Sequence, residues 1–206
     1  NFSQYEKQLQ KLLDQHVVTE EIIRLVDPIS ILNTELFEEE LEKLIGPRAK
    51  AEKIAAATTK HISVNIDMDP VLYKKLSELI IQTIADMRAA RISELEALEK
   101  LKQIKEEAIG KSNSEIPEEV KDKNRKISVF RLFKGEEKLK EQEVVATAFF
   151  DQLLSENELV DWEKRSDIIN KIELEFGDYL MDVFHFTMDE ADELTKKCIE
   201  IAIANK

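Results

Sequence analysis

Apolar residues recur every three or four positions along most of this 206-residue chain, which is the spacing that lines one face of an α-helix. The clearest row follows Asp69 and Pro70, an N-cap and a first-turn proline that open a predicted helix over residues 70–90. A capping box at Ser93 opens the next predicted helix, over residues 93–109. These two segments predict a helical hairpin.

Similar start and stop signals predict the remaining helices, among them capping boxes at Ser3 and Thr187 and the Gly46-Pro47 pair. The expected helices cover residues 3–16, 19–27, 33–45, 47–63, 136–155, 161–184 and the stretch from 187 onward. The pattern predicts an all-α fold, a helical bundle of about eight helices arranged as one domain or as two lobes.

The C-terminal third carries the only tryptophan of the chain. Asp161 is the expected N-cap of the helix over 161–184, with Trp162 in its first turn packed against a neighbouring helix. Its expected apolar stripe is Ile168, Ile169, Ile172, Phe176, Tyr179, Leu180 and Val183. In the helix before it, the residues expected to be buried are Val144, Ala148, Phe149 and Leu153.

Residues 111–126 are polar and lack an apolar period, so they predict a linker. The following run "ISVFRLF", residues 127–133, fits a strand or a hydrophobic helical turn, because so short an apolar run has no decisive period. The expected organisation is an N-terminal helical lobe, a linker with a short apolar segment and an acidic C-terminal helical lobe, over residues 1–110, 111–135 and 136–206 respectively.

Composition supports this class. Four glycines and four prolines are too few for a fold rich in tight turns, and 43% hydrophobic residues are enough for a buried core. Cys198 has no partner for an internal disulfide and no apolar run is long enough to span a membrane, so we expect a soluble cytoplasmic protein. A start at Asn1 rather than methionine fits a piece of a longer chain.

The net charge of −13 is unevenly distributed. Residues 136–206 hold 19 acidic and 8 basic residues, whereas residues 1–135 hold 24 acidic and 22 basic ones. The C-terminal third therefore favours a basic protein partner over nucleic acid, and basic patches are expected only in the first two thirds.

No pattern in the chain predicts catalysis. The four isolated glycines form no phosphate-binding loop, and the acidic pairs lack calcium-loop spacing. His16, His61 and His185 lie far apart, and Cys198 sits at a core-facing spacing. We therefore expect no catalytic residue, no metal site and no cofactor in this chain.

Two groups of basic residues could contact DNA. The segment 121–134 interleaves phenylalanines with Lys121, Lys123, Arg125, Lys126, Arg131 and Lys134, and the predicted helix over 47–63 presents Lys50, Lys53 and Lys60. The alternative for each is a solvated helical face or linker anchored to the core. Asp161, Trp162 and Tyr179 are the candidate contacts to a protein partner, with the core as the alternative place for both aromatic rings.

Several blocks resemble the C-terminal helical domain of type I restriction enzyme R subunits. They are "DPVLYKKLSELIIQTIADMRAARISELEALEKLKQI", "VDWEKRSDIINKIELEFGDYLMDVF", "DQHVVTEEIIRLVDPISILNTELFEEELEKL" and "RAKAEKIAAATTKHI". The resemblance covers most of the chain and is weakest over residues 111–135. It implies a parent polypeptide with a nuclease domain and an ATP- and Mg-dependent DNA translocase, in which this last domain helps dock the R subunit onto the M and S subunits.

The expected function is therefore an assembly and docking module of an ATP-dependent, DNA-translocating endonuclease complex, without chemistry of its own. Its expected partners are the methyltransferase (M) and specificity (S) subunits, with DNA present in the full complex. The alternative is a helical module that binds DNA directly through residues 121–134.

Overall fold

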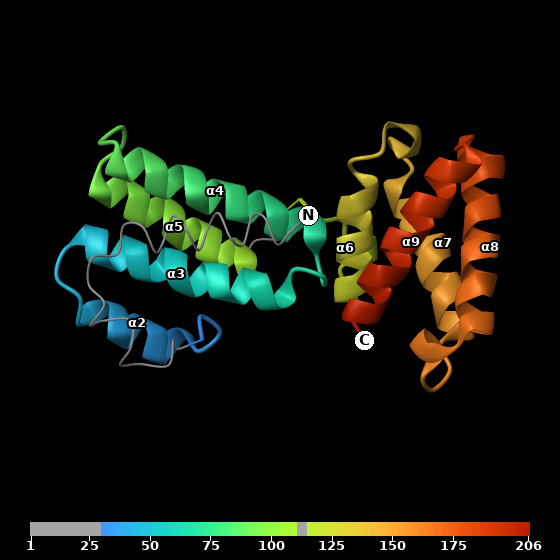
Figure 1. The fold of residues 1–206 in the computed structure, drawn as a ribbon, viewed down its shortest axis with the longest axis horizontal. Coiled ribbons are helices and arrows are strands. Elements are labelled where there is room, and N and C mark those ends of the chain that lie inside the picture. The colour runs from blue at the N-terminus through green and yellow to red at the C-terminus, as the bar shows by residue number, and fades with distance from the viewer. Residues whose placement is uncertain (1–29, 111–114) are drawn as a thin grey trace. The chain divides into compact units, whose positions relative to one another are not determined.

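The computed structural model describes residues 30–110 and 115–206 (Figure 1). Every regular element in these ranges is helical and none is a strand, which confirms the all-α prediction. The chain divides into two compact units, unit 1 within Asn1–Ile66 and Tyr73–Asn113, and unit 2 formed by Asp67–Leu72 and Ser114–Lys206. The helices expected over residues 3–16 and 19–27 lie outside the described residues.

Unit 1 contains α2 (Thr34–Glu42), α3 (Pro47–Asn65), most of α4 (Pro70–Arg88) and α5 (Glu94–Ala108). Helices α3, α4 and α5 lie side by side in Figure 1. Gly46 has a φ of 88°, a conformation that glycine adopts without strain, and the Pro47 that follows it starts α3 as expected.

The predicted hairpin is present in unit 1 as α4 and α5. The Tyr73 hydroxyl donates to the Ala108 carbonyl at 3.4 Å, and the Ser93 hydroxyl accepts from the Glu96 backbone N–H at 3.1 Å. Fully buried apolar side chains fill the unit: Phe37, Ala51, Ile54, Ile62, Leu76, Ala97 and Leu101. Lys105 is buried with them, and its ammonium group donates to Glu38 at 2.7 Å.

Unit 2 contains the 3-10 turns η1 (Glu118–Val120), η2 (Glu137–Leu139) and η3 (Trp162–Lys164) and the helices α6 (Asn124–Phe133), α7 (Glu143–Asn157), α8 (Ser166–Phe184) and α9 (Met188–Ala204). The four helices form a bundle (Figure 1). Its main core includes Phe133, Leu139, Phe150, Leu154, Trp162, Ile172, Phe176, Leu180, Leu194 and Cys198. The capping box at Thr187 is confirmed, because both of its reciprocal hydrogen bonds to Glu190 are present.

The stretch expected to be a linker differs in the structure. Residues 115–133 belong to unit 2, with Ile116, Val120, Ile127 and Phe130 forming a small hydrophobic cluster. The run over 127–133 is helical as part of α6, because its apolar residues pack on both α7 and α9 rather than on a sheet. The packing of this run against neighbouring helices therefore settles its helical structure, which its short apolar period alone could not predict.

The helix expected over 136–155 begins only at Glu143. Leu139 is fully buried within η2, and Glu141 has a φ of 67°, so the backbone turns before α7 begins. The expected burial of Ala148 was wrong: it is exposed, and the buried row of α7 is Ala146, Thr147, Phe150, Leu153 and Leu154.

The expectation that Asp161 caps the following long helix was also wrong. Asp161 has a φ of 56°, its side chain makes no capping hydrogen bond, and α8 begins at Ser166. The intervening turn η3 exists because the indole of Trp162, only 1% exposed, packs into the core instead of lying on the helix.

Candidate functional site

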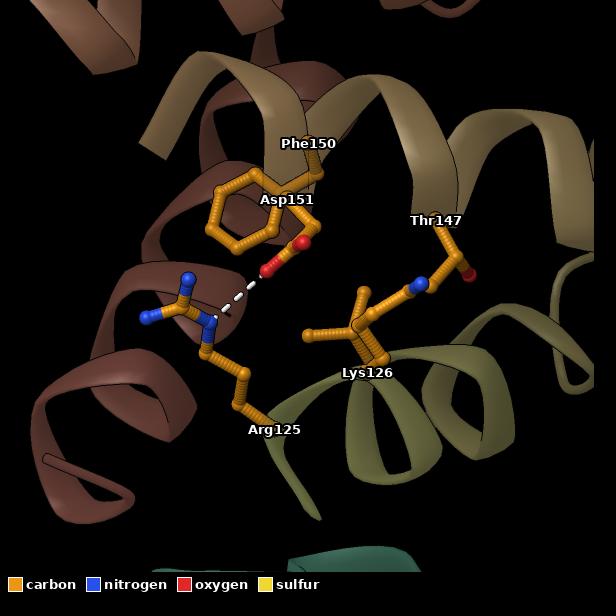
Figure 2. Close-up of a pocket in the computed structure, with 6 residues that line it drawn as sticks. Arg125, Lys126, Thr147, Phe150 and Asp151 are labelled. Atoms are coloured by element: carbon orange, nitrogen blue, oxygen red, sulfur yellow. Dashed lines mark hydrogen bonds and ion pairs between the residues drawn. The ribbon is translucent and has the colours of Figure 1, made fainter. Parts of the chain in front are cut away.

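The strongest polar cluster of unit 2 joins the start of α6 to α7. Arg125 donates from Nε to Asp151 Oδ1 at 2.7 Å and from Nη1 to Glu158 Oε1 at 2.8 Å. Lys123 donates to the second carboxylate oxygen of Asp151 at 2.8 Å, and both cations also reach Ser155. Figure 2 shows the contact between the Arg125 guanidinium and the Asp151 carboxylate.

The hydrogen bonds of this cluster stabilise the charged form of Arg125. Burial of the guanidinium disfavours its charged form, but hydrogen bonds to Asp151 and then Glu158 outweigh that effect and raise the pKa of Arg125. The depression beside it, lined by Lys126, Thr147 and Phe150 among others, is too shallow to enclose a ligand. The arrangement therefore suits a structural clamp between two helices.

The other basic residues of the segment 121–134 also have acidic neighbours within unit 2. The pairs are Lys121 with Glu118, Lys126 with Asp122, Arg131 with Asp69, and Lys134 with Glu143. Lys126 donates in addition to the Glu119 carbonyl at 2.8 Å. The predicted DNA-contacting segment is thus largely neutralised by carboxylates of its own unit.

The second predicted basic group lies on α3 in unit 1. Lys50 and Lys53 are half-buried, whereas Lys60 is exposed. At 1.5 Å per residue, Lys60 lies about 15 Å along the helix axis from Lys50. The pKa of Glu40 is lowered mainly by a hydrogen bond from Lys43. The positive charge of Lys53 lowers the pKa of this carboxyl further. These lysines do not form a continuous cationic stripe.

The candidate partner contacts separate into a core residue, a turn residue and a surface residue. Trp162 is a core residue, so the interpretation as a partner contact was wrong for this side chain. Asp161 is exposed in the turn before η3 and pairs with Lys164 at 3.1 Å. Only Tyr179 lies in an aromatic group that reaches the surface.

That aromatic group lies where α7 and α8 pack. The rings of Phe149 and Tyr179 are stacked with centroids 3.9 Å apart, and Phe184 meets Tyr179 edge-on at 5.4 Å. All three side chains are half-buried, and desolvation raises the pKa of Tyr179. Val145 and Val183, 52% and 51% exposed, stand one helical turn from Phe149 and Tyr179 respectively. We call these five residues the α7–α8 face.

Sequence reasoning named Tyr179 and favoured the core for Phe149, but it missed the valines of this face as surface residues. Val183 was expected inside, yet the buried row of α8 leads to Phe184, and Val183 lies on the neighbouring row with Tyr179 and is half exposed. Val145 was detectable in principle, because it lies four residues from Phe149 and off the buried row of α7.

Acidic side chains surround the α7–α8 face. Glu175 and Asp182 lie four residues before and three after Tyr179, and Asp178 adjoins it. Lys171, the only base of α8, lies 3.8 Å from Glu175. Among the described residues, Asp178 and Asp182 have no ion-pair partner. This apolar patch with free carboxylates beside it is the best candidate for an interaction site in unit 2.

Candidate chemical groups remain scattered in the described ranges. No three His, Cys, Asp or Glu residues gather there in a way that could hold a metal ion. Burial lowers the pKa of His61, and His185 is exposed at the C-terminal end of α8; His16 lies outside the described residues. Cys198 is buried, as expected from its spacing, and burial raises the pKa of its thiol well above the ordinary value.

Comparisons with known proteins add no assignment: no family model, no curated protein and no solved structure matches the chain. Over residues 30–110 and 115–206, no helix has the length and apolar character needed to cross a membrane.

Proposed function

We propose that this chain is the C-terminal assembly domain of a type I restriction enzyme R subunit and docks that subunit onto its M and S partners. The proposal starts from the resemblance of the helical blocks quoted above to that domain. In this assignment the chain performs no chemistry itself. ATP, Mg and DNA cleavage belong to other domains of the cytoplasmic parent polypeptide.

The observation that carries the proposal is the α7–α8 face. Soluble domains scatter exposed apolar residues singly, whereas a contiguous patch of aromatic and aliphatic side chains is typical of a protein contact. The face also has acidic neighbours, such as the exposed Asp182, that have no ion-pair partner in the part of the chain that the structure describes. Both features support a protein partner with a basic surface.

Direct DNA binding has weaker support from the same geometry. A cation can contact a DNA phosphate only if giving up its present partner costs little stability. Arg125 is bound by two carboxylates, so releasing it would be costly. Releasing it would leave the half-buried Asp151 with Lys123 as its one remaining cationic partner among the described residues.

The test uses the purified 206-residue chain and a purified complex of M and S subunits. We expect the chain to co-elute with that complex in size-exclusion chromatography. We also expect an R subunit lacking this domain to lose assembly while its ATPase activity remains. Absence of co-elution, together with normal assembly of the shortened R subunit, would contradict the proposal.

A further inference from the structure

We infer that the α7–α8 face binds a basic amphipathic helix of a partner polypeptide, with apolar side chains on the face and lysine or arginine over the neighbouring carboxylates. This inference rests on the proposed docking function and names the chemistry of the partner at one surface. The apolar pairs of the face, the charge beside it and the fixed register of its two helices support this partner.

The face lies along the line where two antiparallel helices pack together. The Phe149–Tyr179 stack and the hydrogen bond from Lys171 to Asn157 Oδ1 at 2.9 Å fix the register of α8 against α7. In that register Val145 comes opposite Val183, one helical turn from the stacked rings. These two apolar pairs, one helical turn apart, match the spacing of the i and i+4 apolar side chains of an amphipathic partner helix.

The stacked rings are suited to act as the central anchor. Tyr179 also approaches Phe176, which is fully buried, with centroids 6.2 Å apart, so contact with the core holds the half-buried Tyr179 ring in place. A ring fixed in advance loses little conformational freedom on binding. Aromatic anchors of this kind dominate the energy of many interfaces.

Charge selects a basic helix over an acidic or neutral one. Helix α8 carries five acidic residues and one lysine, and α7 carries three acidic residues and no base. Two of the α7 acids, Glu143 and Asp151, already have cationic partners, whereas Asp178 and Asp182 on α8 have none within residues 30–110 and 115–206. The free negative charge therefore lies on the α8 side of the face, where a lysine or arginine of the partner would meet it.

The first test measures binding of a labelled designed peptide of about 18 residues, with leucine at helical i, i+3, i+4 and i+7 spacing and lysine elsewhere. Val183→Lys is compared with Leu174→Lys, which introduces the same charge at a 65% exposed position of α8 outside the face. We expect Val183→Lys to weaken binding about tenfold or more and Leu174→Lys to leave it within about twofold. Equal affinities of the two variants, or equal binding of a peptide with glutamate for lysine, would overturn the inference.

A second comparison tests the charge. Asp178→Asn with Asp182→Asn removes two negative charges beside the face, and Asp192→Asn with Glu200→Gln removes two exposed ones from α9. We expect only the first pair to weaken peptide binding, by about threefold to tenfold at low salt. If both double variants lost the same binding affinity, the net charge of the chain alone would explain the loss, and this would contradict a defined binding surface. A dimer of the chain that Val183→Lys dissociates would show that a second copy occupies the face instead.

The same variants keep this inference separable from the proposed function. Each is also tested for co-elution with the complex of M and S subunits. Normal co-elution of Val183→Lys would disprove the surface while leaving the docking function intact. Peptide binding that depends on Val183, in a chain that does not co-elute with M and S, would support the surface and refute the family-based function.

Discussion

The two sides of α7 differ in whether the acidic residues beside them are paired. On one side, Asp151 and the Glu158 that follows the helix are bound by Lys123 and Arg125 at the start of α6, so these charges cancel inside the unit. On the other side, Val145 and Phe149 face α8 beside two of its acids that have no ion-pair partner among the described residues. Removing one member of a buried ion pair costs stability, whereas charges left free beside apolar side chains are available to another molecule.

The largest expected effect concerns the separation of core from surface. Trp162→Ala should lower the free energy of unfolding by about 3–5 kcal/mol, because a buried ring is lost and a cavity remains. Val160→Ala, two residues away and 89% exposed, should change it by less than about 0.5 kcal/mol. Urea unfolding followed by circular dichroism measures both. Similar stabilities would mean that Trp162 belongs to the surface after all.

The next effect compares the two regions directly. Asp151→Ala leaves Arg125, whose side chain is 11% exposed, without its nearest carboxylate and should cost about 2–3 kcal/mol of stability. Asp182→Ala removes an exposed, unpaired acid and should change stability by less than about 0.5 kcal/mol. The same urea experiment measures both variants. Equal losses would remove the distinction between paired and free acids.

How far the sequence could predict this molecule depends on the range of the interactions. The caps at Asp69, Ser93 and Thr187 involve residues three apart, and the structure contains all three. Local patterns also set the class of the fold, because helix starts and apolar rows repeat within a few residues. The buried row of α7 was misplaced, since a run with adjacent Phe149 and Phe150 fits more than one helical face.

The site depended on contacts that no local pattern encodes. Arg125 and Asp151 lie 26 residues apart, so their pairing was invisible in a segment interpreted as a linker. Trp162 was placed correctly against neighbouring helices, but its burial displaced the start of α8 from Asp161 to Ser166. Val183 appeared to be a core residue because a helical period does not reveal which of two adjacent i, i+4 rows the neighbouring helices cover.

A smaller effect concerns pH at another acid of unit 2. Glu190 accepts from Lys138 and then from the Thr187 backbone, which lowers its pKa to about 2. A carboxyl with a lowered pKa stabilises the fold above its unfolded pKa, near 4.3, and loses this contribution as pH falls toward 2. The difference in melting temperature between the native chain and Glu190→Gln should therefore shrink from pH 6 to pH 2.

Lys138→Met provides the matched control, because it removes the largest cause of that shift and leaves the carboxyl in place. An NMR titration of Glu190 should then move its midpoint upward, toward the ordinary value. A midpoint near 4.5 in the native chain would contradict the hydrogen bonds from Lys138 and Thr187 to this carboxylate.

The smallest expected effect is on DNA. Lys121→Gln and Lys134→Gln replace the two lysines of the basic segment whose acidic partners are Glu118 and Glu143, and should change binding of a short duplex by less than about twofold. Fluorescence anisotropy across a salt series measures this. A DNA affinity that falls steeply with salt, and that is lower still in these variants, would mean that these lysines exchange their acidic partners for DNA phosphates. Because Arg125 has two carboxylate partners and Lys134 only one at 3.8 Å, such release would begin at Lys134, the least firmly held cation.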